Sequence, residues 1–280
     1  MIREIHAREI TEVVKKLCID ANCHLPKDVQ NCIIGCREHE TWPQAQEILD
    51  RIIENYKIAD DRQVPICQDT GMACVFVKIG QDVHVVGDIE EAIQEGVRQG
   101  YAEGYLRKSV VRDPLDRVNT HDNTPAIIYF EPIAGDKIEI MVAPKGFGSE
   151  NMSQIKMLRP SDGVDGVKDF VLKVVEEAGP NPCPPIVVGV GIGGTFDKAA
   201  YLAKKALTRD LDTRNENPFY AALEEELLER INQLGIGPQG FGGRTTALAV
   251  NIEQFPTHIA GLPVAVNINC HVTRHKKEVL

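Results

Sequence analysis

Hydrophobic residues recur at helical spacing along the first sixty residues of the chain. The repeat is carried by Ile5, Ile10, Val13, Val14 and Leu17. A second apolar repeat follows Thr41-Trp42-Pro43, where proline suits the first turn of a helix. Because apolar positions three or four apart form one face of a helix, the pattern predicts a helical N-terminal segment over about residues 1–60.

The pattern changes to strand character after this segment. Residues 73–80 and 83–86 are rich in valine and isoleucine and flank a short polar turn. Such runs are typical of two strands joined by a turn. Asp88 then precedes two glutamates and an apolar repeat, which predicts an N-capped helix to about Tyr101.

The rest of the chain mixes both kinds of element. The pattern predicts strands at 126–130, 137–143, 186–190 and 262–268, and helices at 163–178, 196–207 and 218–234. Between them, residues 107–125 are polar and lack periodicity, which is typical of a long functional loop. Residues 274–277 are basic and predict a solvated tail. Because the elements do not alternate strictly, we expect an α/β fold: a mixed sheet with flanking helices, in a single domain over 1–280.

Composition narrows the class of protein. The chain has 280 residues, of which 43% are hydrophobic and 26% charged, as in globular proteins. Its 31 basic and 41 acidic residues give a net charge of −10, which disfavours nucleic acid and anionic membranes as partners. There is no apolar run of about 18 residues and no apolar leader, so we expect neither a membrane span nor a signal peptide. Eight cysteines then indicate reduced thiols in the cytoplasm.

Two motifs allow cofactor hypotheses that the surrounding sequence weakens. Residues 189–194 contain G-x-G-x-x-G after a strand, as in dinucleotide sites, but a polar stretch and another helix follow instead of a second strand. A generic anion site or a tight strand-to-helix turn explains the glycines equally well. A zinc site is the second hypothesis, formed by Cys18, Cys23, Cys32, Cys36, His24 and His39. None of these cysteine pairs has C-x2-C spacing, so buried thiols are the simpler explanation.

Three other cysteines have unusual neighbours. Cys67 lies in a turn between a predicted helix and strand, Cys183 precedes two prolines, and Cys270 follows the last predicted strand. Spacing alone does not distinguish metal ligands from buried thiols here.

Five strings in order give the chain a family resemblance over about residues 10–275. They are Ile66-Cys-Gln-Asp-Thr-Gly71, Lys145-Gly-Phe-Gly-Ser-Glu-Asn151, Cys183-Pro-Pro185, Gly191-Ile-Gly-Gly-Thr195 and Leu234-Gly-Ile-Gly-Pro-Gln-Gly240. Together they resemble the α-type catalytic chain of the iron–sulfur hydro-lyases, the family of class I fumarases and L-tartrate dehydratases. The resemblance implies a 4Fe–4S cluster held by Cys67, Cys183 and Cys270. Three thiolates leave one iron open, and an open iron can act as a Lewis acid.

The resemblance also implies a substrate site for a small dicarboxylate. It assigns substrate contacts to Gln68, Asp69, Arg107, Gly146, Gly148 and His258. Arg107 would bind one carboxylate through its guanidinium, and the two glycines would offer backbone N–H groups. His258 reaches the site in the family, with a dimer interface as one route. A surface role for Arg107 and a local loop role for His258 are the alternatives.

The fumarase branch is favoured by the strings after Arg107 and around Gly146, with L-tartrate dehydratase or another hydroxy-diacid hydro-lyase as the alternative. In single-chain fumarases a β-type domain follows and supplies the catalytic base, so we expect a separate β subunit here and assign no base to this chain. Homodimerisation of αβ units is also expected. The rival hypotheses are a non-catalytic iron–sulfur regulator, a nucleotide-dependent oxidoreductase and a thiol or zinc enzyme.

Overall fold

The computed structural model describes residues 2–280, which separate into two compact units. The first comprises the described residues up to Leu25, Tyr56–Phe147 and Arg274–Leu280, and the second comprises Pro26–Asn55 and Gly148–Thr273. The chain passes repeatedly between the units, so neither is a continuous stretch of sequence. That residues 1–280 act as one catalytic domain therefore stays a prediction.

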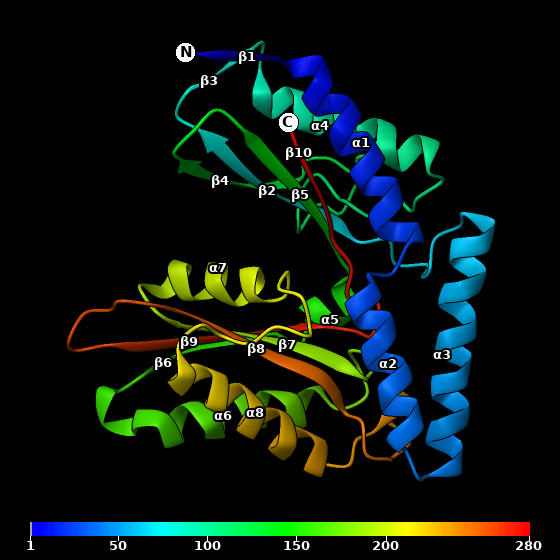
Figure 1. Ribbon diagram of the computed structural model, residues 1–280, viewed down its shortest axis with the longest axis vertical. Coiled ribbons are helices and arrows are strands. Elements are labelled where there is room, and N and C mark those ends of the chain that lie inside the picture. Colours follow the sequence, from blue (N-terminus) through cyan, green and yellow to red (C-terminus); the bar gives the residue numbers. More distant parts are fainter. Residues whose placement is uncertain (1) are drawn as a thin grey trace. The chain divides into compact units, whose positions relative to one another are not determined.

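The first unit is built on a mixed four-stranded sheet in the order β10-β5-β2-β4. Its strands are β2 (Met72–Gly80), β4 (Ile127–Ile133), β5 (Ile138–Lys145) and β10 (Lys276–Val279). Strand β2 is parallel to β4 and antiparallel to β5, which in turn pairs antiparallel with β10. Helices α1 (Ala7–Cys23) and α4 (Ile89–Glu103) pack against each other, and α1 also contacts the sheet. A short parallel pair, β1 (Arg3–His6) and β3 (Val83–Val86), completes the unit (Figure 1).

The second unit is a three-layer arrangement around the sheet β6-β9-β7-β8. Its strands are β6 (Gln154–Leu158), β7 (Ile186–Gly193), β8 (Ala247–Phe255) and β9 (Leu262–Asn269). Helix α7 (Phe196–Ala206) covers one face, and α6 (Gly163–Ala178) and α8 (Pro218–Gln233) cover the other (Figure 1). Helix α2 (Lys27–His39) contacts β8, and α3 (Pro43–Arg62) begins in this unit and ends in the first.

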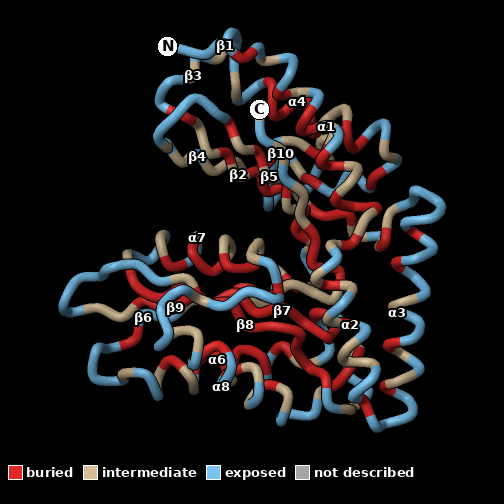
Figure 2. The backbone as a smooth tube through the Cα atoms, in the orientation of Figure 1, coloured by how far each residue is buried: buried red, intermediate tan, exposed pale blue. Residues whose placement is uncertain are grey.

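Each unit has its own apolar core. Buried residues gather on the central strands and on the helix faces turned toward them (Figure 2). Strand β7 is buried along its whole length, which suits a central strand covered on both faces. The cores therefore hold the sheets rigid, and the loops at the strand ends are free to carry chemistry.

The glycines of residues 189–194 serve packing in this fold. A Cβ atom at Gly191 would lie 2.1 Å from the carbonyl oxygen of Ala199 in α7, and one at Gly189 would lie 2.2 Å from that of Ala203. Strand β7 and helix α7 can therefore approach only because both positions lack a side chain. This close packing accounts for two of the glycines without a nucleotide.

Most of the expected architecture is confirmed. The N-terminal segment is helical as α1, α2 and α3, and the fold is α/β with mixed sheets. The solvated basic tail was wrong: Arg274 is buried, and Lys276–Val279 form β10 on the edge of the first sheet. Strands β1, β6 and β8 were also not predicted. Among residues 2–280, every helix is too short or too polar to cross a membrane.

Candidate functional site

The first unit gathers predicted site residues on one turn before β2. Cys67 is half-buried there, Gln68 is exposed and Asp69 is half-buried. The Sγ atom of Cys67 lies 3.3 Å from Oε1 of Gln68 and accepts a hydrogen bond of 3.4 Å from the backbone N–H of Asp69. Hydrogen bonds to ligand sulfur atoms are also a feature of iron–sulfur clusters, where they tune the reduction potential. The turn therefore presents Cys67 in an arrangement that suits metal ligation.

The carboxylate of Asp69 connects this turn to the predicted glycine loop. Its Oδ1 accepts from the backbone N–H of Gly71 at 3.0 Å, and its Oδ2 accepts from that of Phe147 at 2.9 Å. A Cβ atom at Gly146 would lie 3.1 Å from Oδ2. Asp69 and Gly146 are thus neighbours, and the carboxylate accepts hydrogen bonds from two backbone donors. In this structure the carboxylate of Asp69 holds the loop that contains Gly146 against the turn of Cys67.

A buried tyrosine supports the turn from the core side. The hydroxyl of Tyr101 donates to the carbonyl oxygens of Thr70 at 2.9 Å and Gly71 at 3.0 Å. Burial raises the pKa of Tyr101 well above its ordinary value, so the phenol stays a neutral donor. Gly71 has φ of +76°, and a Cβ atom there would lie 2.8 Å from the backbone of Lys145. Only glycine fits this turn without displacing β5.

The same turn holds the start of the loop that carries Arg107. The backbone N–H of Arg107 donates to Oγ1 of Thr70 at 2.9 Å, and that hydroxyl donates to the carbonyl of Arg107 at 3.2 Å. Asn123 is fully buried and ties the loop together: its Oδ1 accepts from Ser109 and its Nδ2 donates to the carbonyl of Gly71. The side chain of Arg107 itself is exposed. The first unit therefore brings five predicted residues together: Cys67, Gln68, Asp69, Arg107 and Gly146.

The second unit presents Cys183 on a loop before β7. Cys183 is exposed and has φ of +56°. The loop is held by Gln239, whose backbone N–H and Nε2 both donate to the carbonyl of Pro184, at 2.8 and 2.7 Å. His271 lies against the same loop, with Nδ1 3.0 Å from the carbonyl of Cys183. These contacts fix the backbone of an exposed cysteine.

Cys270 lies at the same end of this sheet. It follows Asn269, the last residue of β9, which pairs with Val187 near the start of β7. His271, the next residue, reaches the Cys183 loop as described above. The second unit therefore brings Cys183 and Cys270 to the same end of its sheet, where β7 begins and β9 ends.

A polar cluster anchors the segment that contains Gly148 to β9. Oε1 of Glu150 accepts from Nζ of Lys204 at 2.5 Å, and its Oε2 accepts from Nδ2 of Asn267 at 2.7 Å. Asn267 lies three residues before Cys270 and is 6% exposed. Gly148 is exposed, within the short helix α5 (Phe147–Glu150). The segment after Gly148 is thus held against β9, the strand that Cys270 follows.

His258 lies at the other end of β9. It occupies the exposed loop between β8 and β9, where its Nδ1 accepts from the backbone N–H of Ala260 at 3.2 Å. The eight residues of β9 separate this loop from Cys270 by about 25 Å. Within one chain, His258 is therefore not brought together with Cys183 and Cys270.

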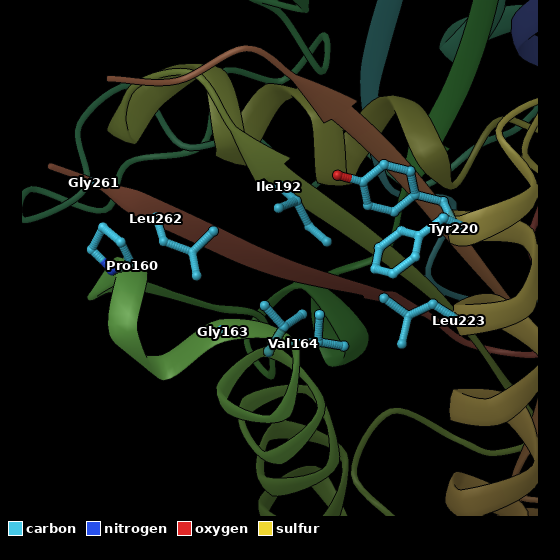
Figure 3. A pocket seen from close by; sticks show the side chains of 10 residues that line it. Pro160, Gly163, Val164, Ile192, Tyr220, Leu223, Gly261 and Leu262 are labelled. Carbon is cyan, nitrogen blue, oxygen red and sulfur yellow. The ribbon is translucent and has the colours of Figure 1, made fainter. Parts of the chain in front are cut away.

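An apolar pocket of 290 Å³ lies at that same far end of the second sheet (Figure 3). Its lining includes Ile192 at the end of β7 and Leu262 at the start of β9, together with Val164 and Tyr220. Apolar walls give a dicarboxylate no compensation for its lost hydration. The pocket is therefore separate from the candidate site.

The four cysteines of the zinc hypothesis are divided between the two units. Cys18 and Cys23 are buried in the first unit, and burial raises the pKa of Cys18 to about 12. Cys32 and Cys36 belong to the second unit, where Sγ of Cys32 lies 3.6 Å from the carbonyl of Leu248. A hydrogen bond from Cys32 lowers the pKa of Cys36. Packing of buried thiols in α1 is enough to explain why cysteine occurs at positions 18 and 23.

Sequence reasoning missed the residues that support the site. Tyr101, Asn123, Gln239 and Arg274 hold the backbone of turns that carry predicted residues. Gln239 belongs to a string that was recognised, but its contact with the Cys183 loop is 55 residues away in sequence. Such contacts depend on the fold, so no local signal could reveal them.

The chain matches a family model described as fumarate hydratase (Fumerase) over residues 11–279. It is 48% identical over 277 residues to a Methanocaldococcus jannaschii protein whose name assigns it provisionally to L(+)-tartrate dehydratase as subunit alpha, covering 95% of each chain. It is 34% identical to the L(+)-tartrate dehydratase subunit alpha of Escherichia coli strain UTI89, covering 95% of this chain and 89% of the relative. The corresponding subunit from strain K12 is 33% identical with the same coverage.

Proposed function

Because the chain belongs to the fumarate hydratase (Fumerase) family, we propose that it is the α subunit of a two-subunit class I fumarate hydratase, which interconverts fumarate and L-malate. At the coarser level, the chain is an α-type subunit of the fumarate hydratase and tartrate dehydratase hydro-lyases. The observation that carries the proposal is the turn at Cys67. It combines a cysteine, an aspartate bound to a glycine loop, and the start of an arginine loop within one unit.

Cys67, Cys183 and Cys270 are proposed to hold a 4Fe–4S cluster. The donor set suits the cluster, because thiolates are its ordinary ligands and three of them leave one iron open. Cys183 is exposed on a fixed backbone, and Cys67 has an N–H donor directed at its sulfur. When bound, the cluster supplies a Lewis acid that polarises the hydroxyl group lost as water.

The proposed substrate contacts surround Cys67 in the first unit. Gln68 is exposed beside the thiol and can donate its amide to a carboxylate or hydroxyl. Arg107 is exposed on its anchored loop and can bind a carboxylate with two parallel hydrogen bonds. Gly146 and Gly148 leave room for a substrate to approach backbone N–H groups. Asp69 holds this loop and borders the same space.

Two further parts of the proposal involve other chains. His258 lies far from Cys270 along β9, so its proposed substrate contact is to the site of a second copy. The relatives are named as alpha subunits, which supports a β-type partner. The partner is proposed to supply the base that takes the proton from the carbon next to the hydroxyl-bearing carbon.

L-tartrate is the second candidate substrate, because the relatives described above carry tartrate dehydratase names. Tartrate has one hydroxyl group more than malate. A site that hydrogen-bonds this hydroxyl rejects the substrate lacking it strongly, by up to about 10⁴–10⁵-fold. The two candidates are therefore separable by kcat/KM on one preparation.

The test is co-expression of this chain with its β partner under anaerobic conditions. We expect about four irons and four sulfides per α chain, and fumarate hydration by the complex but not by either chain alone. Cys67→Ser, Cys183→Ser and Cys270→Ser should each lose the cluster, and Cys32→Ser should keep it. A complex that dehydrates tartrate and leaves fumarate unchanged would move the assignment to the second candidate. A chain that binds no iron after anaerobic reconstitution would overturn the cluster.

A further inference from the structure

Arg274 is a buried cation beneath the turn of Cys67. The residue is 4% exposed, and its Nη2 donates to the backbone carbonyl of Asp69. Its Nε and Nη1 atoms are buried and have no hydrogen-bond partner among residues 2–280. The guanidinium thus has two donor nitrogens without an acceptor, and its third nitrogen donates to a neutral carbonyl.

Such a group is unfavourable in a folded chain. A guanidinium stays charged in proteins, and its burial is costly unless an anion or several acceptors compensate. One carbonyl supplies neither a charge nor a full set of acceptors. The energetics therefore favour an anionic group near Arg274 in the active protein.

The turn of Cys67 is where such an anion can act. The path from Nη2 of Arg274 to Sγ of Cys67 runs through Asp69, whose carbonyl accepts from Arg274 and whose N–H lies 3.4 Å from the sulfur. With standard backbone dimensions, the two atoms are at most about 10 Å apart. At an effective dielectric constant of about 20, a unit charge at this distance changes an equilibrium by on the order of tenfold.

We propose that Arg274 is the counter-charge for the iron–sulfur cluster bound through Cys67, and that it holds the turn in the conformation that directs the Asp69 N–H at the sulfur. The inference rests on the proposed function, because the anionic group is the thiolate-bound cluster. Net charge and hydrogen bonds to sulfur both set the reduction potential of such clusters. Arg274 contributes to both and is a positioning residue, with no contact to substrate.

The test compares three variants of the full chain after anaerobic reconstitution with iron and sulfide. Arg274→Met removes the charge and retains most of the length, whereas Arg274→Lys retains the charge. Arg98→Met is the matched control, since Arg98 belongs to the same unit but pairs with Glu95 and Asp122. Each is compared for the reduction potential of the cluster and for the rate of cluster loss to an iron chelator.

We expect Arg274→Met to lower the reduction potential and to speed cluster loss on the order of tenfold. Arg274→Lys should restore most of the potential, and Arg98→Met should match the wild type in both measurements. Without cluster, Arg274→Met should melt no lower than wild type, because an uncompensated buried charge has been removed.

An unchanged potential and loss rate in Arg274→Met would overturn the inference, and leave Arg274 as a structural link to Asp69. If Arg274→Met does not fold, Arg274→Gln takes its place with the same expectations. A wild-type chain that forms no cluster would instead refute the proposed function, so the two failures are distinguishable.

Discussion

Replacing Asp69 with asparagine tests whether its carboxylate fixes the loop that contains Gly146. The aspartate accepts from two backbone N–H groups, those of Gly71 and Phe147, with one oxygen for each. Asparagine offers a single oxygen and turns an NH2 group toward the other donor. One charge-assisted hydrogen bond is lost and one backbone N–H loses its acceptor.

The magnitude follows from the half-buried position of the carboxylate. A hydrogen bond to a charged group contributes about 1.5–3 kcal/mol, and partial exposure reduces this to about 1–2 kcal/mol. For a chain of this size, that predicts a melting temperature lower by about 2–5 °C. Differential scanning calorimetry of the full chain without cluster measures it, free of any substrate effect.

Asp88→Asn is the matched control. Asp88 caps α4 by accepting from the N–H of Glu91, and asparagine caps a helix about as well. The same chemical change should therefore leave the melting temperature within about 1 °C of wild type. If Asp69→Asn and Asp88→Asn melt together, the carboxylate of Asp69 does not fix the loop and the reasoning fails.

Three further predictions concern packing, the turn and pH. Gly191→Ala should cost about 3 kcal/mol or more, because its Cβ would lie 2.1 Å from a carbonyl oxygen of α7. Gly35→Ala, with open space in α2, should stabilise by up to about 1 kcal/mol. Urea titration measures the free energy of unfolding of both variants, and equal effects would contradict the packing role. Tyr101→Phe should lower the free energy of unfolding by about 1–2 kcal/mol and speed alkylation of Cys67, whose turn the Tyr101 hydroxyl supports. An alkylation rate equal to that of the wild type would contradict this support. Burial raises the pKa of Cys18 to about 12 in the folded chain. The neutral thiol's contribution to the free energy of unfolding is therefore fully present below the ordinary thiol pKa and is lost as pH rises toward 12. At pH 10 this costs about 1–2 kcal/mol, and Cys18→Ala should flatten the fall in unfolding free energy between pH 8 and 10; an unchanged slope would contradict it.

The helices were predictable because each has one apolar face. In α1, the residues at helical spacing include Ile10, Val14 and Leu17, and all are buried. The missed strands lack such a pattern for physical reasons. Strand β10 reads Lys-Lys-Glu-Val and lies at the edge of its sheet, where charged residues are tolerated and block further pairing.

The interior strand β8 was missed for a different reason. Its apolar run is interrupted by Asn251, which is fully buried and donates to the carbonyl of Ala206. Such a residue reads as a loop signal in sequence, and only the tertiary partner makes it acceptable in a core. The same holds for Arg274, whose basic neighbours predict a solvated tail although its side chain is buried.

Positions in the site were predictable through the family strings, but roles were not. Asp69 was expected to contact substrate, and the structure directs both of its oxygens at backbone N–H groups. That orientation depends on a tight turn at Gly71 and on the approach of Phe147 from 78 residues away. Neither the turn geometry nor the long-range approach is encoded in the local pattern around Cys67.

The balance of charge around a bound dicarboxylate favours a site that this chain shares with a β subunit. A dicarboxylate brings two negative charges, and the carboxylate of Asp69 adds a third beside them. In the part of the chain that the structure describes, Arg107 and Lys108 are exposed cations at the start of the loop anchored to this turn, while Arg274 is buried. One guanidinium binds one carboxylate bidentately and cannot neutralise two. The proposed function therefore requires a second cationic group for the other carboxylate, and the candidates are Lys108, an open iron and basic side chains of a β subunit.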